Sequence, residues 1–370
     1  MDRRALMLAA ACTLTLIAGC RNINPEEAMA KAVAFHAAHD YQSARVELMN
    51  ALQADPKNVK ARLLAAEVMI QLGDGVAAER EIALAREGGA GEVETRPLLA
   101  RAYLQQMLPA KALDLLGEQA SDTDSAEIYR LRGEAFGALD KDAQSAQQFE
   151  QGLAAFPQDP LLLVNMARLR HSERALDEAA TLAAKAAEIA PALLDVQMMN
   201  ADVALAKGDL ANAQIWFDKA IAAYPLDLPA KLGKATVLWE RNDRKGALAI
   251  AAEVLKKDPK SPVAIMMKAT DLADAGKEEE ALALMRTTIP FFENDPTSLR
   301  IKGDLEFRKG FYATAARHYR QAVNQRPDAP ELRYKLASAL VKDGDTDGAR
   351  TVLAPVAARD DIPAALQPLL

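Results

Sequence analysis

Small residues recur along this chain with a period of 34, and this period constrains the fold more than any other feature. Nine alanines and one serine form the series, with a single step of 33 before the serine. Its members are Ala44, Ala78, Ala112, Ser145, Ala179, Ala213, Ala247, Ala281, Ala315 and Ala349. A fixed period of this length is typical of stacked helix–turn–helix units, each of which buries its apolar face against the next. It predicts an all-α array, and a binding scaffold before an enzyme.

Three other residue types keep the same phase. Proline follows the small residue by twelve positions and ends the second helix of a unit, because it lacks the amide donor; the examples are Pro56, Pro157, Pro191, Pro225, Pro259 and Pro327. Glycine precedes it by five and predicts a turn with positive φ, at Gly73, Gly208, Gly276, Gly310 and Gly344. Large apolar side chains follow it by four and fill the space beside a close helix contact, at Leu48, Ile82, Leu116, Phe149, Phe217, Met285, Tyr319 and Leu353.

The repeated unit resembles the tetratricopeptide repeat (TPR). The segments Arg130–Phe136 and Ala213–Ile221, the latter followed by Pro225, match the TPR pattern of small, bulky and aromatic positions. The resemblance implies an all-α superhelical solenoid of about ten helix–turn–helix repeats over residues 25–356, with residues 357–370 as a C-terminal tail or cap. We place the repeat starts near residues 25, 59, 93, 126, 160, 194, 228, 262, 296 and 330.

The N-terminal segment resembles a bacterial lipoprotein signal. A short basic start precedes an apolar run that is short for a membrane-spanning helix, and Leu16–Cys20 resembles a lipobox. This predicts cleavage of residues 1–19, acylation of Cys20 and an anchor segment over residues 20–24. Several acyl chains hold a protein on a bilayer far better than one. The alternative is an ordinary secretory signal that happens to end before a cysteine. Arg21 follows the cysteine where inner-membrane lipoproteins commonly carry aspartate, which favours the periplasmic face of the outer membrane.

Cysteine content and charge exclude several function classes. The only cysteines are Cys12 and Cys20, so the cleaved and acylated chain has no free thiol for a disulfide, a zinc site or a nucleophile. The formal net charge is −7, which argues against a general nucleic-acid binder with a basic face.

Catalytic and metal-binding patterns are also lacking, and no cofactor is expected. No phosphate-binding loop, nucleophile elbow or dinucleotide fingerprint occurs. His36 and His39 lie three residues apart, but ordinary polar positions near a helix end explain them better than a metal site. The segment Asp343–Gly348 matches the start of a calcium loop, yet Ala354 stands where the bidentate carboxylate is needed. The repeat phase explains this segment without calcium.

The TPR resemblance implies a groove lined by the first helix of each unit, and predicts which residues bind a partner there. The candidates are Arg101, Arg130, Arg168, His171, Met198, Trp239, Met266, Arg300, Phe307 and Tyr334. Arginine, methionine and aromatic residues are favoured in binding hot spots. Trp239 is the leading candidate, and the alternative is that it packs against a neighbouring helix. Trp216, beside Phe217, is predicted to be packing. The lysine–asparagine clamp that holds a chaperone's C-terminal carboxylate is not recognisable.

A narrower resemblance concerns the pathway. The segments Ala44–Pro56, Ala61–Leu64, Leu72–Gly75 and Ala85–Ala90 resemble TPR lipoproteins that accompany exosortase/PEP-CTERM and exopolysaccharide systems. This implies a non-enzymatic, membrane-anchored periplasmic adaptor that binds protein partners of the cell envelope. One alternative is an assembly factor for an outer-membrane pore, either a secretin or a β-barrel. Another is carbohydrate binding with Trp239, Phe307 and Tyr334 as stacking platforms.

Overall fold

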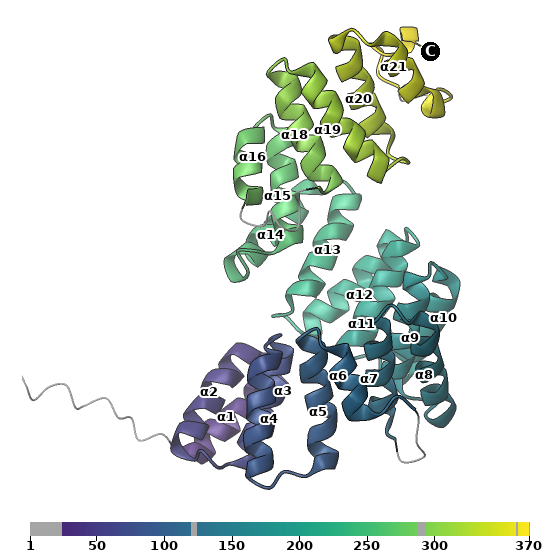
Figure 1. Cartoon of the computed structure of the whole chain (residues 1–370). Coiled ribbons are helices and arrows are strands. Elements are labelled where there is room, and N and C mark those ends of the chain that lie inside the picture. The colour runs from purple at the N-terminus through teal and green to yellow at the C-terminus, as the bar shows by residue number, and fades with distance from the viewer. Residues whose placement is uncertain (1–23, 120–123, 287–293, 360–361, 370) are drawn as a thin grey trace, which may run out of the picture. The chain divides into compact units, whose positions relative to one another are not determined.

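The computed structural model describes residues 24–119, 124–286, 294–359 and 362–369, and none of these residues lies in a β-strand (Figure 1). The chain divides into two compact units, Met1–Asp227 (unit 1) and Leu228–Leu370 (unit 2). The predicted array of residues 25–356 spans both units. Cys20 and the segment around it lie outside the described residues.

Unit 1 consists of helix pairs. Its helices are α1 (Pro25–Ala37), α2 (Tyr41–Ala54), α3 (Val59–Gln71), α4 (Gly75–Glu87), α5 (Glu92–Gln105), α6 (Pro109–Leu116), α7 (Ala126–Gly137), α8 (Asp142–Ala155), α9 (Pro160–Ser172), α10 (Leu176–Ile189), α11 (Leu194–Ala206) and α12 (Leu210–Ala223). Each odd-numbered helix packs against the next even-numbered one, as in an αα-hairpin.

Unit 2 repeats the pattern. Its helices are α13 (Leu228–Glu240), α14 (Arg244–Lys257), α15 (Pro262–Asp274), α16 (Glu278–Met285), α18 (Pro296–Arg308), α19 (Tyr312–Gln325), α20 (Pro330–Asp343) and α21 (Thr346–Leu353), followed by the short 3₁₀ turns η2 (Ala354–Val356) and η3 (Gln367–Leu369). No helix of the described residues is long and apolar enough to cross a bilayer.

The predicted all-α fold of repeated helix pairs is confirmed. Nine of the ten predicted repeat starts are the first residue of a helix, and α5 begins one residue before the predicted position. Local chemistry explains many starts of first and second helices alike, because a side-chain oxygen accepts a backbone N–H there. Asparagine or aspartate caps of this kind are Asn24, Asp40, Asn58, Asp74, Asp159, Asp209, Asp243, Asp295 and Asp345.

The turn inside each pair has one fixed requirement, a residue with positive φ five positions before the small residue. The five predicted glycines have this conformation, with φ from 75° to 92°. In the other five pairs non-glycine residues adopt it, namely His39, Met107, Asp140, Arg174 and Asn242, with φ from 56° to 65°. Such conformations are uncommon for residues with a Cβ. The turn geometry therefore holds in all ten pairs, whatever residue occupies it.

The small residues lie in the core, where two helices approach closely. All nine alanines of the period are fully buried, and the Ser145 hydroxyl donates to the Gly133 carbonyl at 2.8 Å. The large apolar side chains four residues later are buried as well. Phe149 lies against Gly133, and Tyr319 lies against Gly303, so the ring takes the space that a Cβ would occupy.

We expect Gly133→Ala to lower the free energy of unfolding by about 1–3 kcal/mol, because the added Cβ would overlap the ring of Phe149. Gly137→Ala in the same helix is the matched control. Its Cβ would meet only Ser145 Oγ at 3.5 Å, and alanine is the better helix former by about 1 kcal/mol. Urea unfolding followed by circular dichroism measures both variants. Equal stability changes would contradict this account of the packing.

The C-terminal segment packs against the last helix pair. Ile362 and Leu366 are buried in the same cluster as Leu336 and Leu340 of α20. This contact covers apolar surface at the end of the array that no further pair covers in the described chain. Terminal repeats of such arrays need this kind of cover.

Candidate functional site

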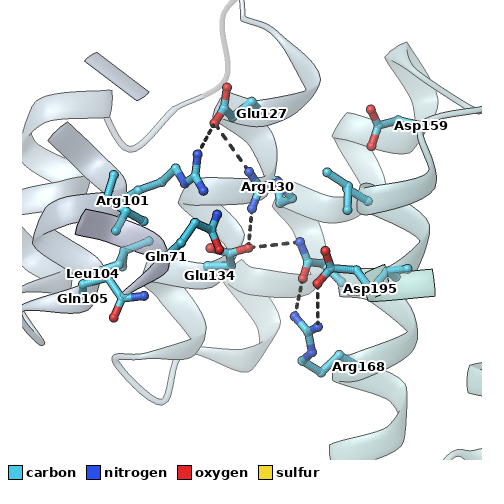
Figure 2. A pocket seen from close by; sticks show the side chains of 14 residues that line it. Gln71, Arg101, Leu104, Gln105, Glu127, Arg130, Glu134, Asp159, Arg168 and Asp195 are labelled. Atoms are coloured by element: carbon cyan, nitrogen blue, oxygen red, sulfur yellow. Dashed lines mark hydrogen bonds and ion pairs between the residues drawn. The ribbon is translucent and has the colours of Figure 1, made fainter. Parts of the chain in front are cut away.

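Three of the predicted arginines line one cavity of about 690 Å³ in unit 1 (Figure 2). Arg101 lies on α5, Arg130 on α7 and Arg168 on α9. The other lining residues are Ile70, Gln71, Leu104, Gln105, Glu127, Glu134, Asp159, Leu161, Val164, Asn165 and Asp195. They come from the first helices of five consecutive pairs, α3 to α11, so the repeat places them along one wall. We call this the unit 1 cavity.

Positive and negative side chains alternate along this wall. Glu127 lies 4.0 Å from Arg101 and 3.6 Å from Arg130. Arg130 continues to Glu134 at 2.8 Å. The Glu134 carboxylate also accepts from Asn165 Nδ2 at 3.1 Å, and Asn165 Oδ1 accepts from Arg168 at 2.7 Å. The result is a continuous row of donors and acceptors across three first helices, α5, α7 and α9.

The row is tight in its middle and loose at its ends. Arg130 is mostly buried and holds Glu134 closely, whereas the Arg168 side chain is 58% exposed and stands 4.0 Å from Asp195. Arg101 has an equally long contact with Glu127. Exposed pairs at such distances contribute little to stability. Arg101 and Arg168 can therefore exchange these partners for the groups of a ligand at small cost.

Two further candidates in unit 1 lie outside this set. His171 on α9 and Met198 on α11 are both half-buried, and neither lines the unit 1 cavity. They remain predictions on the same helices as Arg168 and Asp195.

Trp239 in unit 2 already has a partner on its ring. The Arg244 guanidinium lies 4.2 Å from the ring centroid, within the range of a cation–π contact. The indole is half-buried and packs against the core cluster of α13 to α15. Met266 is also half-buried and packs against the α15–α16 cluster. Both side chains thus contribute to packing, and each keeps an exposed part.

The three remaining candidates line a second cavity of about 580 Å³, the unit 2 cavity. They are Arg300 and Phe307 on α18 and Tyr334 on α20. Tyr334 is only 8% exposed, and Phe307 makes an edge contact with Tyr312 at 5.2 Å. The predicted stacking platforms are therefore largely occupied by neighbours. Pro363 of the C-terminal segment also lines this cavity.

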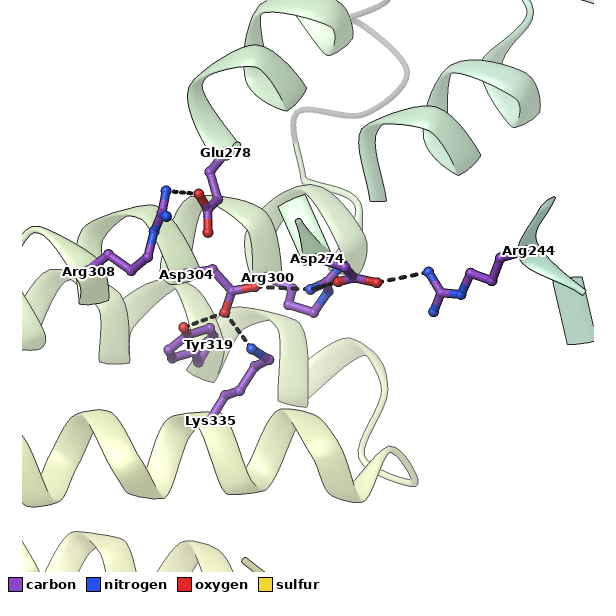
Figure 3. A network of polar contacts seen from close by, with 8 residues as sticks. All are labelled: Arg244, Asp274, Glu278, Arg300, Asp304, Arg308, Tyr319 and Lys335. Atoms are coloured by element: carbon purple, nitrogen blue, oxygen red, sulfur yellow. Dashed lines mark hydrogen bonds and ion pairs between the residues drawn. The ribbon is translucent and has the colours of Figure 1, made fainter. Parts of the chain in front are cut away.

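Asp304 organises the polar wall of the unit 2 cavity (Figure 3). Its carboxylate accepts from the Tyr319 hydroxyl at 2.7 Å, from Lys335 Nζ at 2.7 Å and from Arg300 at 3.0 Å. Burial and the Asp304 charge raise the pKa of Tyr319, so this phenol stays protonated and donates. Arg300 also contacts Asp274 at 3.2 Å, and Arg244 joins the same carboxylate at 2.8 Å.

Sequence reasoning missed several residues of these two sites. Glu127 and Asp195 occupy the second position of their repeats, one of the groove positions, but neither was among the predicted groove residues, which did include the carboxylates Glu134 and Asp304. Asn165 and Lys335 both occupy the sixth position, which the groove rule did not include. A search for polar residues at position six of the first helices would have found both.

The segment Asp343–Gly348, which matches the start of a calcium loop in sequence, contains the end of α20 and the start of α21. Gly344 has φ 92° and ends α20, while Asp345 accepts the Gly348 backbone N–H and begins α21. Among the described residues, no group of three or more His, Cys, Asp or Glu side chains is arranged to hold a metal ion.

Comparison with known proteins identifies the repeats. The sequence model of the tetratricopeptide repeat family matches residues 35–94 and 307–369, which confirms TPR repeats in both units. No curated protein matches the chain. A tetratricopeptide repeat protein from Parabacteroides merdae ATCC 43184 has 14% identity, a TM-score of 0.46 and coverage of 76% of this chain and 98% of its own.

Two other solved structures share helix pairs with the chain. Yeast Tom70 has 15% identity and a TM-score of 0.38, with 94% of this chain and 86% of Tom70 covered. PilW, a widely conserved type IV pilus biogenesis factor, has 19% identity and a TM-score of 0.35, with 65% of this chain and 96% of PilW covered. At these values the likeness concerns the fold alone.

Proposed function

From the TPR repeats and the unit 1 cavity, we propose that this protein is a non-enzymatic scaffold of the bacterial cell envelope. It binds an extended segment of a protein partner in the unit 1 cavity. The observation that carries the proposal is the row of alternating charges along the first helices, from Arg101 to Asp195.

The dimensions of the cavity suit an extended chain. Its lining residues come from five consecutive first helices. Neighbouring packed helices lie about 8–10 Å apart, so the lining from α3 to α11 is roughly 32–40 Å long and accommodates about ten to twelve extended residues. A segment of this length contacts several repeats at once, and a few anchors can supply most of its binding energy.

The chemistry of the wall favours a polypeptide over other polymers. Four carboxylates alternate with three arginines, so the wall has no excess of positive charge to bind the phosphates of a nucleic acid. The described lining residues include no aromatic side chain on which a sugar ring could stack. A peptide of mixed charge supplies partners for both signs, and its backbone amides can pair with Asn165, Gln71 and Gln105.

The setting of this scaffold follows from the two sequence resemblances. Acylation of Cys20 would hold the chain on a membrane, with the outer membrane's periplasmic face as its location. The likeness of the first repeats to lipoproteins of exosortase/PEP-CTERM and exopolysaccharide systems favours a partner in polymer export or protein sorting. This part of the proposal rests on the sequence.

In-cell photo-crosslinking tests the proposal directly. A photoreactive residue replaces Gln71 or Gln105, two exposed glutamines that line the cavity, and adducts are identified by mass spectrometry. Gln147 on α8 is the matched control, because it is exposed and does not line the cavity. We expect adducts with one protein from the two cavity positions and none from the control.

Charge reversal at the loose end of the row strengthens the test. Arg168→Glu is expected to lower the adduct yield about tenfold, because it places a repulsive charge where the partner's acidic group binds. An adduct with an export or sorting component would support the proposed pathway, and a pore subunit would favour an assembly factor instead. Equal adducts from Gln147 and Gln105, or none from any position in the folded variants, would refute binding in this cavity.

A further inference from the structure

The first and the sixth helix pairs of unit 1 touch each other. His39, in the turn between α1 and α2, places its ring 4.4 Å from the ring of Tyr224 at an angle of 77°. Tyr224 is the C-cap residue of α12. In an array of repeats each unit ordinarily contacts only its neighbours. This contact therefore joins the two ends of unit 1 and closes its helix pairs into one turn.

Each of the two rings, His39 and Tyr224, also contacts a residue from its own end of unit 1. The Tyr41 hydroxyl lies 2.6 Å from His39 Nδ1, and the two rings make an edge contact at 5.5 Å. On the other side, the Tyr224 hydroxyl donates to the Ala192 carbonyl at 2.9 Å. Each ring is therefore held in position by a contact at its own end of the unit before it packs against the other ring. His39 also keeps the positive φ of the turn, 56°, without being glycine.

The closing contact lies within electrostatic range of two residues of the unit 1 cavity. Burial, followed by the charges of Asp227 and Asp195, raises the pKa of Tyr41, and Arg101 lowers it. Arg101 and Asp195 are lining residues at two ends of the charged row. The helices that supply the lining, α3 to α11, lie in the chain between the two residues that meet, His39 and Tyr224.

We infer that the His39–Tyr224 contact is an acid-sensitive gate: protonation of His39 separates the first pair from the sixth and opens the side of the unit 1 cavity. This inference goes beyond the proposed function, because it concerns a conformational change of this chain with or without a partner.

The direction of the pH effect follows from the surroundings of His39. Burial lowers its pKa, repulsion from His36 lowers it further, and Asp227 opposes both effects. Opening exposes the ring, and its pKa returns toward the ordinary value of about 6.5. A proton therefore binds more tightly to the open form. Closure is fully favoured above about pH 6.5 and is lost as the pH falls through the lowered pKa.

Other charged groups lie near the contact, on α1, on α3 and at the start of α2. His36 of α1 has the Glu67 carboxylate of α3 at 3.8 Å, which offsets part of its charge when it is protonated. Asp40 caps α2 by accepting the Ser43 backbone N–H. When Tyr41 donates to His39 Nδ1, that nitrogen is unprotonated, so protonation at Nδ1 would reverse this hydrogen bond and make the Tyr41 oxygen the acceptor.

Pulsed electron–electron double resonance tests the gate on the full chain. Cys12 and Cys20, the only cysteines, are replaced with serine, and nitroxide labels are placed at Gln42 of α2 and Ala223 of α12. Both positions are exposed. We expect one short distance at about pH 8 and a second, longer distance at about pH 5. The open-to-closed ratio should rise by up to about tenfold per pH unit between about pH 6.5 and the lowered pKa, and should level off below it.

Two variants assign the response. His39→Asn keeps a residue that tolerates positive φ and removes the imidazole, so its distance distribution should not change with pH. His318→Gln is the matched control, because His318 lies in unit 2 and burial lowers its pKa as well. It should respond like the parent. A parent distribution that is the same at both pH values, or a His39→Asn variant that responds like the parent, would overturn the inference. No partner is needed, so the outcome is independent of the crosslinking result.

Discussion

Replacing Arg132 with methionine is expected to lower the free energy of unfolding by about 3–5 kcal/mol. Arg132 is 1% exposed and is the largest fully buried side chain of the described residues. Its guanidinium donates to Asp124 at 2.6 Å, to the Gly117 carbonyl at 2.5 Å and to the Leu116 carbonyl at 2.8 Å. It therefore neutralises a buried carboxylate and satisfies the last carbonyls of the short helix α6.

The cost of this substitution is electrostatic and not steric. Methionine fills much of the space, but it leaves the Asp124 side chain, 2% exposed, without its close cation. It also leaves the buried Leu116 carbonyl without its donor, at about 1–3 kcal/mol, and removes the part-buried contact with the Gly117 carbonyl. Urea unfolding followed by circular dichroism measures the loss.

Arg96→Met provides the comparison. Arg96 approaches the same carboxylate at 3.8 Å and is partly exposed, so its loss should cost less than about 1 kcal/mol. Adding Asp124→Asn to Arg132→Met should cost less than the sum of the single changes, because the buried charge has been removed. If Arg132→Met and Arg96→Met destabilise equally, the buried pair does not hold α6 and α7 together.

Asp304→Ala is expected to destabilise unit 2 by about 3 kcal/mol. Asp304 is the common acceptor for Tyr319, Arg300 and Lys335, which lie on α19, α18 and α20. Its removal leaves a buried phenol without an acceptor and two cations without their shared counter-charge. The chain then loses polar contacts between two consecutive helix pairs at one point.

A graded series separates these contributions. Asp304→Asn keeps an acceptor for the Tyr319 hydroxyl and loses the charge, so it should cost about half as much as Asp304→Ala. Tyr319→Phe should cost about 1 kcal/mol, and Lys335→Met still less, because Lys335 is partly exposed. Thermal or urea unfolding of the full chain ranks the variants. A Lys335→Met loss as large as that of Asp304→Ala would show that the network is not centred on Asp304.

The fold could be predicted well from the sequence because each signal of the repeat involves residues that lie close together in the chain. Caps, small residues and large apolar residues each obey constraints within a few positions, and together they placed helix starts to within one residue. The turn signal was found in only half of the pairs. His39 and Arg174 adopt the same positive φ as Gly73, because the packing of the two helices fixes the turn and the preference for glycine is only moderate.

The candidate sites were less predictable, since they depend on which side chains find partners. The position rule placed Arg101, Arg130 and Arg168 on one wall, as the structure shows. It gave no sign that Arg244, from the following helix, would cover the ring of Trp239. The contact between His39 and Tyr224 joins residues five repeats apart. A periodic sequence pattern cannot predict a contact between residues so far apart in the chain.

Closure of unit 1 also fixes how many repeats it can have. An open array tolerates the gain or loss of a whole 34-residue unit, because each unit meets only those beside it. In unit 1 the position of Tyr224 opposite His39 depends on every pair between them. Deleting one internal repeat would leave each remaining interface formed and yet carry the two rings out of reach. Unit 1 can therefore keep its closing contact only with its present number of repeats, whereas an open array has no such requirement.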